Sequence, residues 1–145
     1  MFKTILVPTD GSELSAKAVT TAVEFARLHG SKLVGVAAAE PFPFTTLYEG
    51  GVVYEPQQFE DKMRQLAEQN VHAVADAANK AGVACETVVA QSFNPYEVII
   101  EAAKKYQCDA IFMASHGRRG LNRLFLGSET QKVLAHSDIP VLVLR

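Results

Sequence analysis

The chain has 145 residues, which corresponds to one domain of ordinary size. Hydrophobic residues make up 48% of it, and 14 basic against 16 acidic residues leave a net charge of −2. This balance argues against a disordered chain, a general nucleic-acid binder or a membrane-surface binder. Every apolar run is far shorter than the ~20 residues of a membrane-spanning helix. The first run, residues 4–7, ends at Pro8 and gives no sign of a signal peptide, so we predict a cytoplasmic protein.

Short apolar runs alternate with longer stretches of helical periodicity along the whole chain. The runs predict β-strands over residues 4–7, 33–38, 84–90, 110–114 and 141–144. Apolar residues at three- and four-residue steps predict helices over 13–29, about 57–81, from 95 onward and about 128–135. This alternation is typical of a single α/β domain, residues 1–145, whose parallel sheet has right-handed crossovers and helices on both faces.

Residues at the ends of the helical stretches predict where the helices begin and end. Ser12 is expected to cap the first helix, and Gly30 is expected to end it. Asn94 is expected to cap the third helix, with Pro95 at its first position. Ser128 either caps the last helix or donates its hydroxyl to an anion.

Residues 40–56 contain three prolines and two adjacent glycines and predict a long loop. Its aromatic residues either cover a ligand or, as we favour, pin the loop itself: Phe42, Phe44, Tyr48 and Tyr54. The two cysteines, Cys85 and Cys108, fit no metal or redox spacing and are expected to be reduced thiols.

Two loops follow the carboxyl ends of predicted strands, where open α/β sheets bind their ligands. The first is residues 8–12. The second, residues 115–126, contains Gly117, Gly120 and three arginines but no acidic residue. Gly127 and Ser128 begin a helix, and the free N–H groups of a helix N-terminus attract anions. A phosphate ligand fits these features, and so does a plain turn with a capped helix and solvated arginines.

The sequence shows no catalytic cluster. The phosphate motifs G-x-x-x-x-G-K-[ST] and G-x-G-x-x-G after the first strand are both absent. Asp10 fits an Asx turn or a ligand contact. His116 has no identifiable carboxylate partner, so a structural hydrogen bond is favoured over acid–base chemistry, and Ser12 adds no triad by its spacing. We predict no catalytic residues.

Three segments resemble the universal stress protein family. The run Ala114-Ser115-His116-Gly117, nine further residues and then Gly127-Ser128 resembles the family's nucleotide motif, G-x2-G-x9-G-[ST]. Residues 5–12 (ILVPTDGS) resemble its opening, and residues 139–143 (IPVLV) resemble its closing strand. The three segments follow one another in the family's order, so the resemblance spans essentially the whole chain.

The resemblance implies a flavodoxin-like doubly wound sheet of five parallel strands in the order 3-2-1-4-5. It implies binding of ATP, with AMP or ADP as alternatives and Mg²⁺ or Mn²⁺ as a companion ion; the metal ligands are unknown. It places adenine against Pro8, Thr9 and Val36, and it places Asp10 near the ribose or phosphates. The residues expected to bind nucleotide are Pro8, Thr9, Asp10, Val36, Ala114, Ser115, His116, Gly117, Arg118, Gly120, Gly127, Ser128, Glu129 and Thr130.

One position departs from the motif, because Ala114 replaces its first glycine. If that position needs a positive φ, alanine weakens phosphate binding. The favoured function is a nucleotide-gated binding module in stress response. The alternatives are a stress-response interaction protein without nucleotide and, by fold analogy alone, a slow ATPase.

The last strand, residues 141–144, would lie at the sheet edge in this strand order. An apolar edge strand is a template for pairing with a second copy. Many family members dimerise through this strand, so we predict a homodimer.

Overall fold

The computed structural model describes residues 1–43, 55–118 and 125–145. Its five strands form one parallel sheet in the order β3-β2-β1-β4-β5, which confirms the predicted α/β fold and strand order. Each predicted boundary lies within one residue of the observed one. The elements are β1 (Thr4–Pro8), α1 (Glu13–His29), β2 (Lys32–Ala39), α2 (Pro56–Lys80), β3 (Cys85–Gln91), α3 (Pro95–Lys105), β4 (Ala110–Ala114), α4 (Ser128–His136) and β5 (Val141–Leu144).

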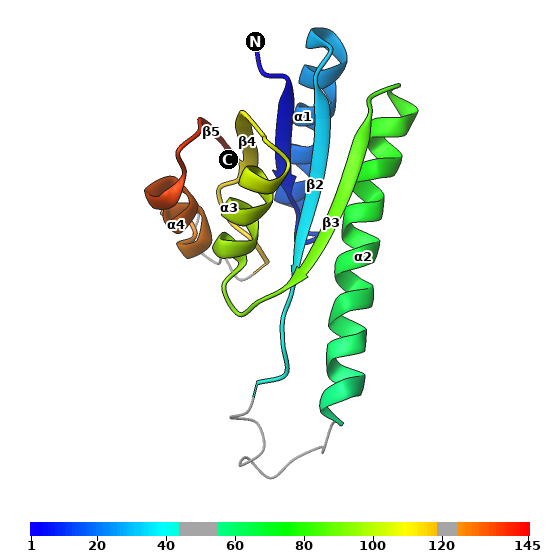
Figure 1. Cartoon of the computed structure of the whole chain (residues 1–145), viewed down its shortest axis with the longest axis vertical. Coiled ribbons are helices and arrows are strands. Elements are labelled where there is room, and N and C mark those ends of the chain that lie inside the picture. Colours follow the sequence, from blue (N-terminus) through cyan, green and yellow to red (C-terminus); the bar gives the residue numbers. More distant parts are fainter. Residues whose placement is uncertain (44–54, 119–124) are drawn as a thin grey trace.

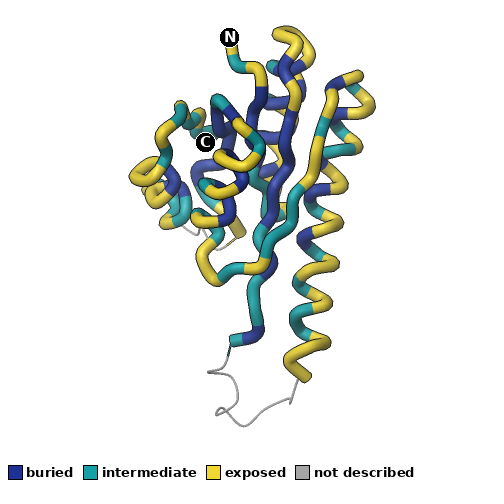
Figure 2. The backbone as a smooth tube through the Cα atoms, in the orientation of Figure 1, coloured by how far each residue is buried: buried dark blue, intermediate teal, exposed yellow. Residues whose placement is uncertain are grey.

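The central strand β1 is buried on both faces, and successive side chains point to opposite sides of the sheet. Ile5 and Val7 pack with the apolar stripes of α1 and α2. Leu6 packs on the other side, with α3 and α4. The sheet is therefore covered by two helices on each face (Figure 1). The central strands are buried, and the sides of the helices that face away from the sheet are exposed (Figure 2).

All strands end at the same edge of the sheet, the lower edge in Figure 1, because they are parallel. Pro8, the last residue of β1, pairs in register with Val36, and Ala114 at the end of β4 pairs with Leu144. The loops after β1 and β4 therefore open side by side, and α2 extends beyond this edge.

The aromatic residues of loop 40–56 fall partly inside the described chain. Phe42 is 8% exposed, and its ring meets the ring of Phe59 on α2 edge to face, with centroids 5.6 Å apart. This contact pins the start of the loop to α2. Phe44, Tyr48 and Tyr54 lie outside the described residues.

Most of the predicted helix ends are confirmed. Ser12 caps α1, because its Oγ accepts the N–H of Ser15 at 3.2 Å, and Gly30 ends α1 with φ of +69°. Asn94 is the N-cap residue of α3 and Pro95 is its first helical residue, as predicted, but the Asn94 side chain makes no capping hydrogen bond. A carboxylate from α4 accepts an N–H of the first turn of α3 instead. Ser128 is not a cap either, because it is the first helical residue and Gly127 is the N-cap.

Both cysteines are free thiols. Burial raises the pKa of Cys108 to about 11, which keeps its thiol protonated. Among the described helices, none combines the length and apolar character needed to cross a bilayer.

Candidate functional site

The carboxylate of Asp10 joins the two loops that the sequence marks as ligand sites. Its Oδ1 accepts the N–H of Ser12 at 2.9 Å, which completes the Asx turn, and its Oδ2 accepts the N–H of Arg118 at 2.7 Å. Burial acts to raise the pKa of Asp10, but hydrogen bonds from Ser12, Arg118 and Ser15 outweigh it and hold that pKa below its ordinary value. Asp10 is therefore ionised at neutral pH and fastens the glycine loop to the end of β1.

The two motif glycines of the second loop are needed for contacts within the protein. A Cβ added at Gly117 would lie 2.5 Å from Oδ2 of Asp10, so any side chain there breaks the bridge. A Cβ at Gly127 would lie 3.1 Å from the carbonyl oxygen of Ser115, to which the N–H of Gly127 donates at 2.8 Å. These close approaches bring the loop and the start of α4 down onto the ends of β1 and β4.

The buried hydroxyl of Thr130 holds the first turn of α4 in place. Thr130 is 3% exposed, and its Oγ1 shares its hydrogen between the carbonyl oxygens of Ala114 and Ser115, each at 3.1 Å. The N–H of Ser115 donates to the carbonyl of Leu144 at 2.7 Å. Ser115 and Thr130 therefore fix the first turn of α4 and the start of the glycine loop to the ends of β4 and β5.

Ala114 occupies the motif's first glycine position without strain. It is the last residue of β4, and among the described non-glycine residues only Gln107 has a positive φ. The extended backbone accepts alanine as readily as glycine, so this position does not need the freedom of a glycine.

His116 leaves one ring nitrogen without a partner. Its Nδ1 lies 2.8 Å from Oγ of Ser115, which is the structural hydrogen bond that the sequence favoured. Its Nε2 is buried and has no hydrogen-bond partner among the described residues. An unsatisfied buried polar group costs about 1–3 kcal/mol. A ligand atom beside this nitrogen would remove that cost.

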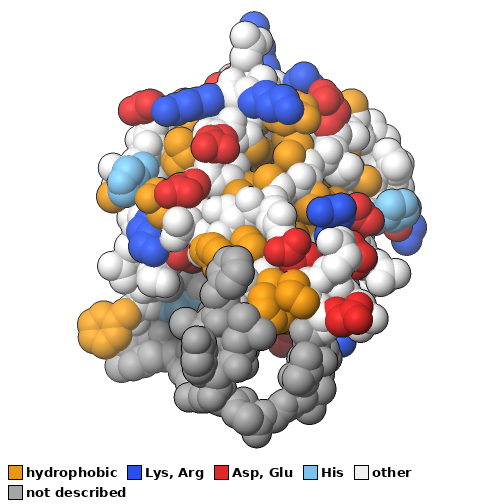
Figure 3. Space-filling view, turned by 60° about the horizontal axis from the view of Figure 1, so that its bottom comes forward, with side chains coloured by type: hydrophobic (Ala, Val, Ile, Leu, Met, Phe, Trp, Pro, Cys, Tyr) orange, Lys and Arg blue, Asp and Glu red, His pale blue; other side chains and the backbone are white. Residues whose placement is uncertain are grey.

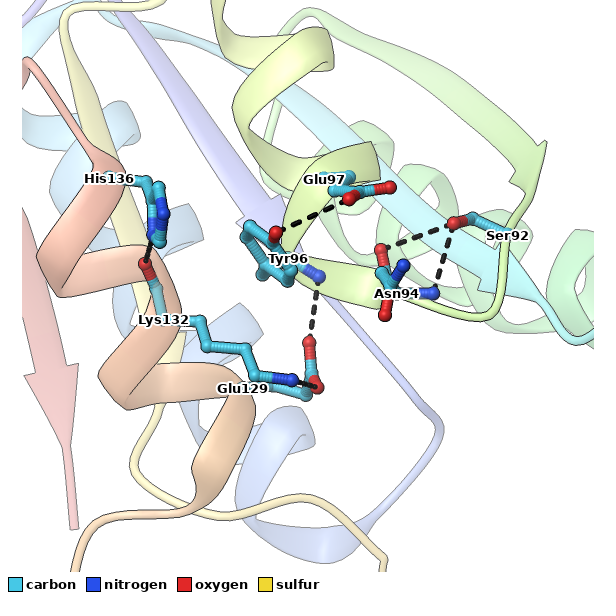
Figure 4. A network of polar contacts seen from close by, with 7 residues as sticks. All are labelled: Ser92, Asn94, Tyr96, Glu97, Glu129, Lys132 and His136. Atoms are coloured by element: carbon cyan, nitrogen blue, oxygen red, sulfur yellow. Dashed lines mark hydrogen bonds and ion pairs between the residues drawn. The ribbon is translucent and has the colours of Figure 1, made fainter.

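The helices α1, α3 and α4 begin near this edge, and they differ in which group accepts the N–H groups of the first turn. The N-terminus of α1 is filled by its own Ser12. That of α3 is filled by Glu129, whose Oε2 accepts the N–H of Tyr96 at 2.8 Å (Figure 4). The first turn of α4 has Gly127 as its N-cap and makes no side-chain capping bond with any described residue. Its N–H groups therefore remain available to an anion.

Glu129 was expected at the nucleotide, but its carboxylate points to α3. Its Oε1 accepts from Nζ of Lys132 at 3.3 Å, and the same ammonium lies 5.4 Å from the ring centroid of Tyr96. Figure 4 shows this side chain spanning the gap from α4 to the start of α3. The Glu129 carboxylate is therefore already bound by the N-terminus of α3 and by Lys132. Its partner on α3, Tyr96, lies 33 residues away in the sequence.

The expected adenine residues lie at the end of β1 and beside it. The side chain of Val36 is 1% exposed and belongs to the core beneath α3, while its carbonyl accepts the N–H of Thr9 at 2.9 Å. Pro8 and Thr9 are half-buried. Val36 therefore sets the position of Thr9 through its backbone carbonyl. Gly120, another expected nucleotide residue, lies outside the described residues.

One residue at this edge gave no signal in the sequence. Asn70, on α2, brings its carboxamide against Gly11, next to the guanidinium of Arg118. It occupies an ordinary position of an amphipathic helix, so only the packing of α2 reveals it.

Loop and helix-end contacts define the site, rather than a closed cavity. A concavity of about 460 Å³ lies between α1 and the end of β5. Figure 3 turns the loop edge toward the viewer and shows hydrophobic and acidic side chains bordering the undescribed residues. Within the described ranges, no three His, Cys, Asp or Glu side chains gather as a metal site.

Comparison with known proteins gives a consistent family. The model of the universal stress protein family matches residues 1–145. A universal stress protein of Thermus aquaticus is 37% identical over 145 residues, covering all of both chains. The universal stress protein YxiE of Bacillus subtilis is 34% identical over 149 residues, again covering both chains fully.

Solved structures agree on the fold. Protein MJ0577 of Methanocaldococcus jannaschii superposes with a TM-score of 0.83 at 25% identity, covering 99% of this chain and 96% of its own. A universal stress protein in complex with cAMP has a TM-score of 0.70 at 22% identity, covering 99% and 97%. One from Archaeoglobus fulgidus in complex with dAMP has a TM-score of 0.66 at 21% identity, covering 99% and 98%.

Proposed function

The chain belongs to the universal stress protein family, and from that premise we propose that it binds an adenine nucleotide at the carboxyl edge of its sheet. The phosphate lies at the first turn of α4, beside Gly127 and Ser128. The nucleotide then acts as the signal of a binding module in stress response, with ATP as the favoured ligand and AMP or ADP as alternatives.

The uncapped N-terminus of α4 carries this proposal. The neighbouring helix ends at α1 and α3 are already occupied by Ser12 and Glu129. The helix α2 also lacks a side-chain cap, but it begins beyond the sheet edge, behind the acidic Glu55 and with Pro56 at its first position. A helix N-terminus favours negative charge by up to about 2 kcal/mol when partly buried. An external anion is therefore best placed at α4.

The free nitrogen of His116 supports a ligand at the same place. The Cα of His116 lies 3.4 Å from the position that a Cβ would take on Gly127, so the ring belongs to the loop that faces α4. A phosphate or ribose oxygen of the nucleotide would give Nε2 the partner it lacks within the described chain. The family neighbours in complex with cAMP and dAMP support adenine as the base.

The residues present fit a nucleotide better than they fit a metal held by the protein. Both oxygens of Asp10 already accept backbone hydrogen bonds. Mg²⁺ or Mn²⁺ would therefore arrive on the phosphates of the nucleotide. When bound there, the ion neutralises phosphate charge, and Asp10 acts by holding the loop.

Native mass spectrometry of the purified protein, followed by titration with a fluorescent ATP analogue, tests the proposal. We expect a nucleotide-sized adduct or saturable binding that unlabelled ATP displaces and that GTP displaces poorly. The absence of saturable binding at millimolar ligand would refute it and favour an interaction protein without nucleotide.

We further propose that two copies pair along β5 as a homodimer. β5 is an outer strand of the sheet, and its Leu142 is 45% exposed. An unpaired apolar edge favours addition of a second strand. Leu142→Asp is expected to halve the mass seen by light scattering, whereas Leu28→Asp, at a 69% exposed position of α1, leaves it unchanged. A monomeric wild type, or a dimer that survives Leu142→Asp, contradicts this pairing.

A further inference from the structure

The carboxamide of Asn70 reaches the ligand loops from α2, on the face of the sheet opposite α4. Its Oδ1 lies 2.5 Å from the position that a Cβ would take on Gly11. Nη2 of Arg118 lies 2.9 Å from that same position. A side chain from a helix and one from the glycine loop therefore meet over the residue that follows Asp10.

Neither of these two polar groups is engaged by the described part of the chain. The Asn70 carboxamide and the Arg118 guanidinium make no hydrogen bond or ion pair there, and Asp10 bonds to the backbone N–H of Arg118 instead. The guanidinium offers five N–H donors in a planar fork, and the amide offers two more. Donors of this kind suit phosphate oxygens.

The glycine loop links this pair to the first turn of α4. The Cα of His116 lies against Gly127 at the α4 end, and the backbone N–H of Arg118 is held by Asp10 at the other end. Two steps of at most about 3.8 Å separate the Cα atoms of His116 and Arg118. A row of phosphates that begins at α4 would run along this short stretch of backbone toward the pair.

We propose that Asn70 and Arg118 bind the distal phosphates of the nucleotide and make the site selective for a triphosphate over a monophosphate. This inference rests on the proposed function and adds to it Asn70 and the number of phosphates. A single phosphate at α4 stops short of the pair. A triphosphate reaches it and supplies acceptors for donors that the described chain leaves free.

Isothermal titration calorimetry with AMP, ATP and inorganic tripolyphosphate tests the inference. The variants are Asn70→Ala, Asn70→Asp and Arg118→Ala, which keeps the backbone N–H that Asp10 holds. Asn79→Ala is the matched control, because it removes an exposed amide from the same helix, nine residues (about 13 Å) away. Circular dichroism confirms that each variant is folded.

In the wild type we expect ATP to bind at least about tenfold more tightly than AMP, which is the effect of a hydrogen bond to a charged group. Asn70→Ala and Arg118→Ala should remove most of this preference while AMP affinity stays within about twofold. Asn70→Asp should weaken ATP and tripolyphosphate further through repulsion, and Asn79→Ala should match the wild type.

Each other outcome overturns a distinct claim. Equal losses of AMP and ATP affinity in the Asn70 variants, or no loss of either, overturn the phosphate role of Asn70 and leave nucleotide binding standing. A wild type that binds tripolyphosphate through Asn70 but no nucleotide refutes the proposed function and keeps the pair as a phosphate site. A wild type that binds none of the three probes overturns both.

Discussion

The helices α1 and α4 both begin at the loop edge of the sheet, after β1 and β4, yet their N-termini differ in one respect. α1 is closed by its own chain, because Ser12 caps it and Asp10 forms the turn before it. α4 begins at Gly127, with no capping side chain among the described residues. One helix end thus serves the stability of the fold, whereas the other is left with donors for a ligand.

The difference comes from the residue type at each N-cap. A serine or aspartate places an oxygen over the N–H groups of the first turn, and a glycine places nothing there. At α4 a larger residue is also hindered, since the carbonyl oxygen of Ser115 lies 3.1 Å from a Cβ at Gly127. The same close packing that fixes the start of α4 therefore keeps its N–H groups unoccupied.

Giving α4 the cap that α1 has should produce the largest effect. In Gly127→Asp the new carboxylate competes with phosphate for the same N–H groups, and we expect nucleotide affinity to fall about a hundredfold or more. Gly127→Ala is the control, because it adds the same Cβ without the carboxylate. Calorimetric titration of both variants measures the difference. If they bind ATP equally, the phosphate does not lie at the first turn of α4.

Breaking the bridge between the two loops should come next. In Asp10→Asn the amide nitrogen cannot accept, so one backbone N–H, of Ser12 or Arg118, loses its partner. We expect a loss of about 1–3 kcal/mol in the free energy of unfolding at neutral pH, measured by urea denaturation.

This loss should depend on pH with a defined sign. The pKa of Asp10 in the fold is lower than the ordinary value of 3.8, so its contribution is fully present above pH 3.8 and disappears as pH falls through the folded pKa. The wild type and Asp10→Asn should therefore converge in acid. Curves that stay parallel down to the lowest pH at which the protein folds would show that the Asp10 carboxylate is not stabilised by these bonds.

Removing the cap of α1 should have a smaller effect, confined to stability. Ser12→Ala is expected to lower the free energy of unfolding by about 1 kcal/mol, since the N–H of Ser15 loses its acceptor. Nucleotide affinity should stay at the wild-type value. Urea denaturation and ATP titration of the same preparation check both parts, and a selective loss of affinity would mean that α1 also contacts the ligand.

The smallest effect concerns the charge next to the open helix end. Glu129→Gln keeps an oxygen for the N–H of Tyr96 but removes a negative charge one residue from Ser128. We expect ATP to bind about two- to fivefold more tightly at low salt, and the gain to shrink at high salt. Glu101→Gln, an equal charge change at an exposed position of α3, is the control. Weaker binding in Glu129→Gln would assign the carboxylate a direct role at the ligand.

Local patterns in the sequence were enough for the elements and for the N-terminus of α1. Alternating apolar runs predicted the strands. Asp10 and Ser12 each bond to a backbone N–H no more than three residues further along the chain, in the turn and the cap that precede α1. These features depend on neighbours along the chain, so periodicity and residue type determine them.

The contacts that complete the site depend on residues far apart in sequence. The cap expected of Asn94 is replaced by Glu129, 33 residues downstream of Tyr96, because α3 and α4 pack side by side. Asn70 meets Gly11 only because α2 lies against the same face as α1. The packing of the Val36 side chain in the core beneath α3 likewise depends on residues far along the chain. Such contacts follow from packing and have no local signature.

One hydrogen bond made by β5 bears on how the protein is handled in the laboratory. The carbonyl of Leu144, at the end of β5, accepts the N–H of Ser115, where the glycine loop begins. An affinity tag fused after Arg145 would load the strand end that anchors this loop and would crowd the proposed pairing edge. Met1 lies at the opposite edge of the sheet (Figure 1). Purification tags therefore belong at the N-terminus when nucleotide binding or oligomeric state is to be measured.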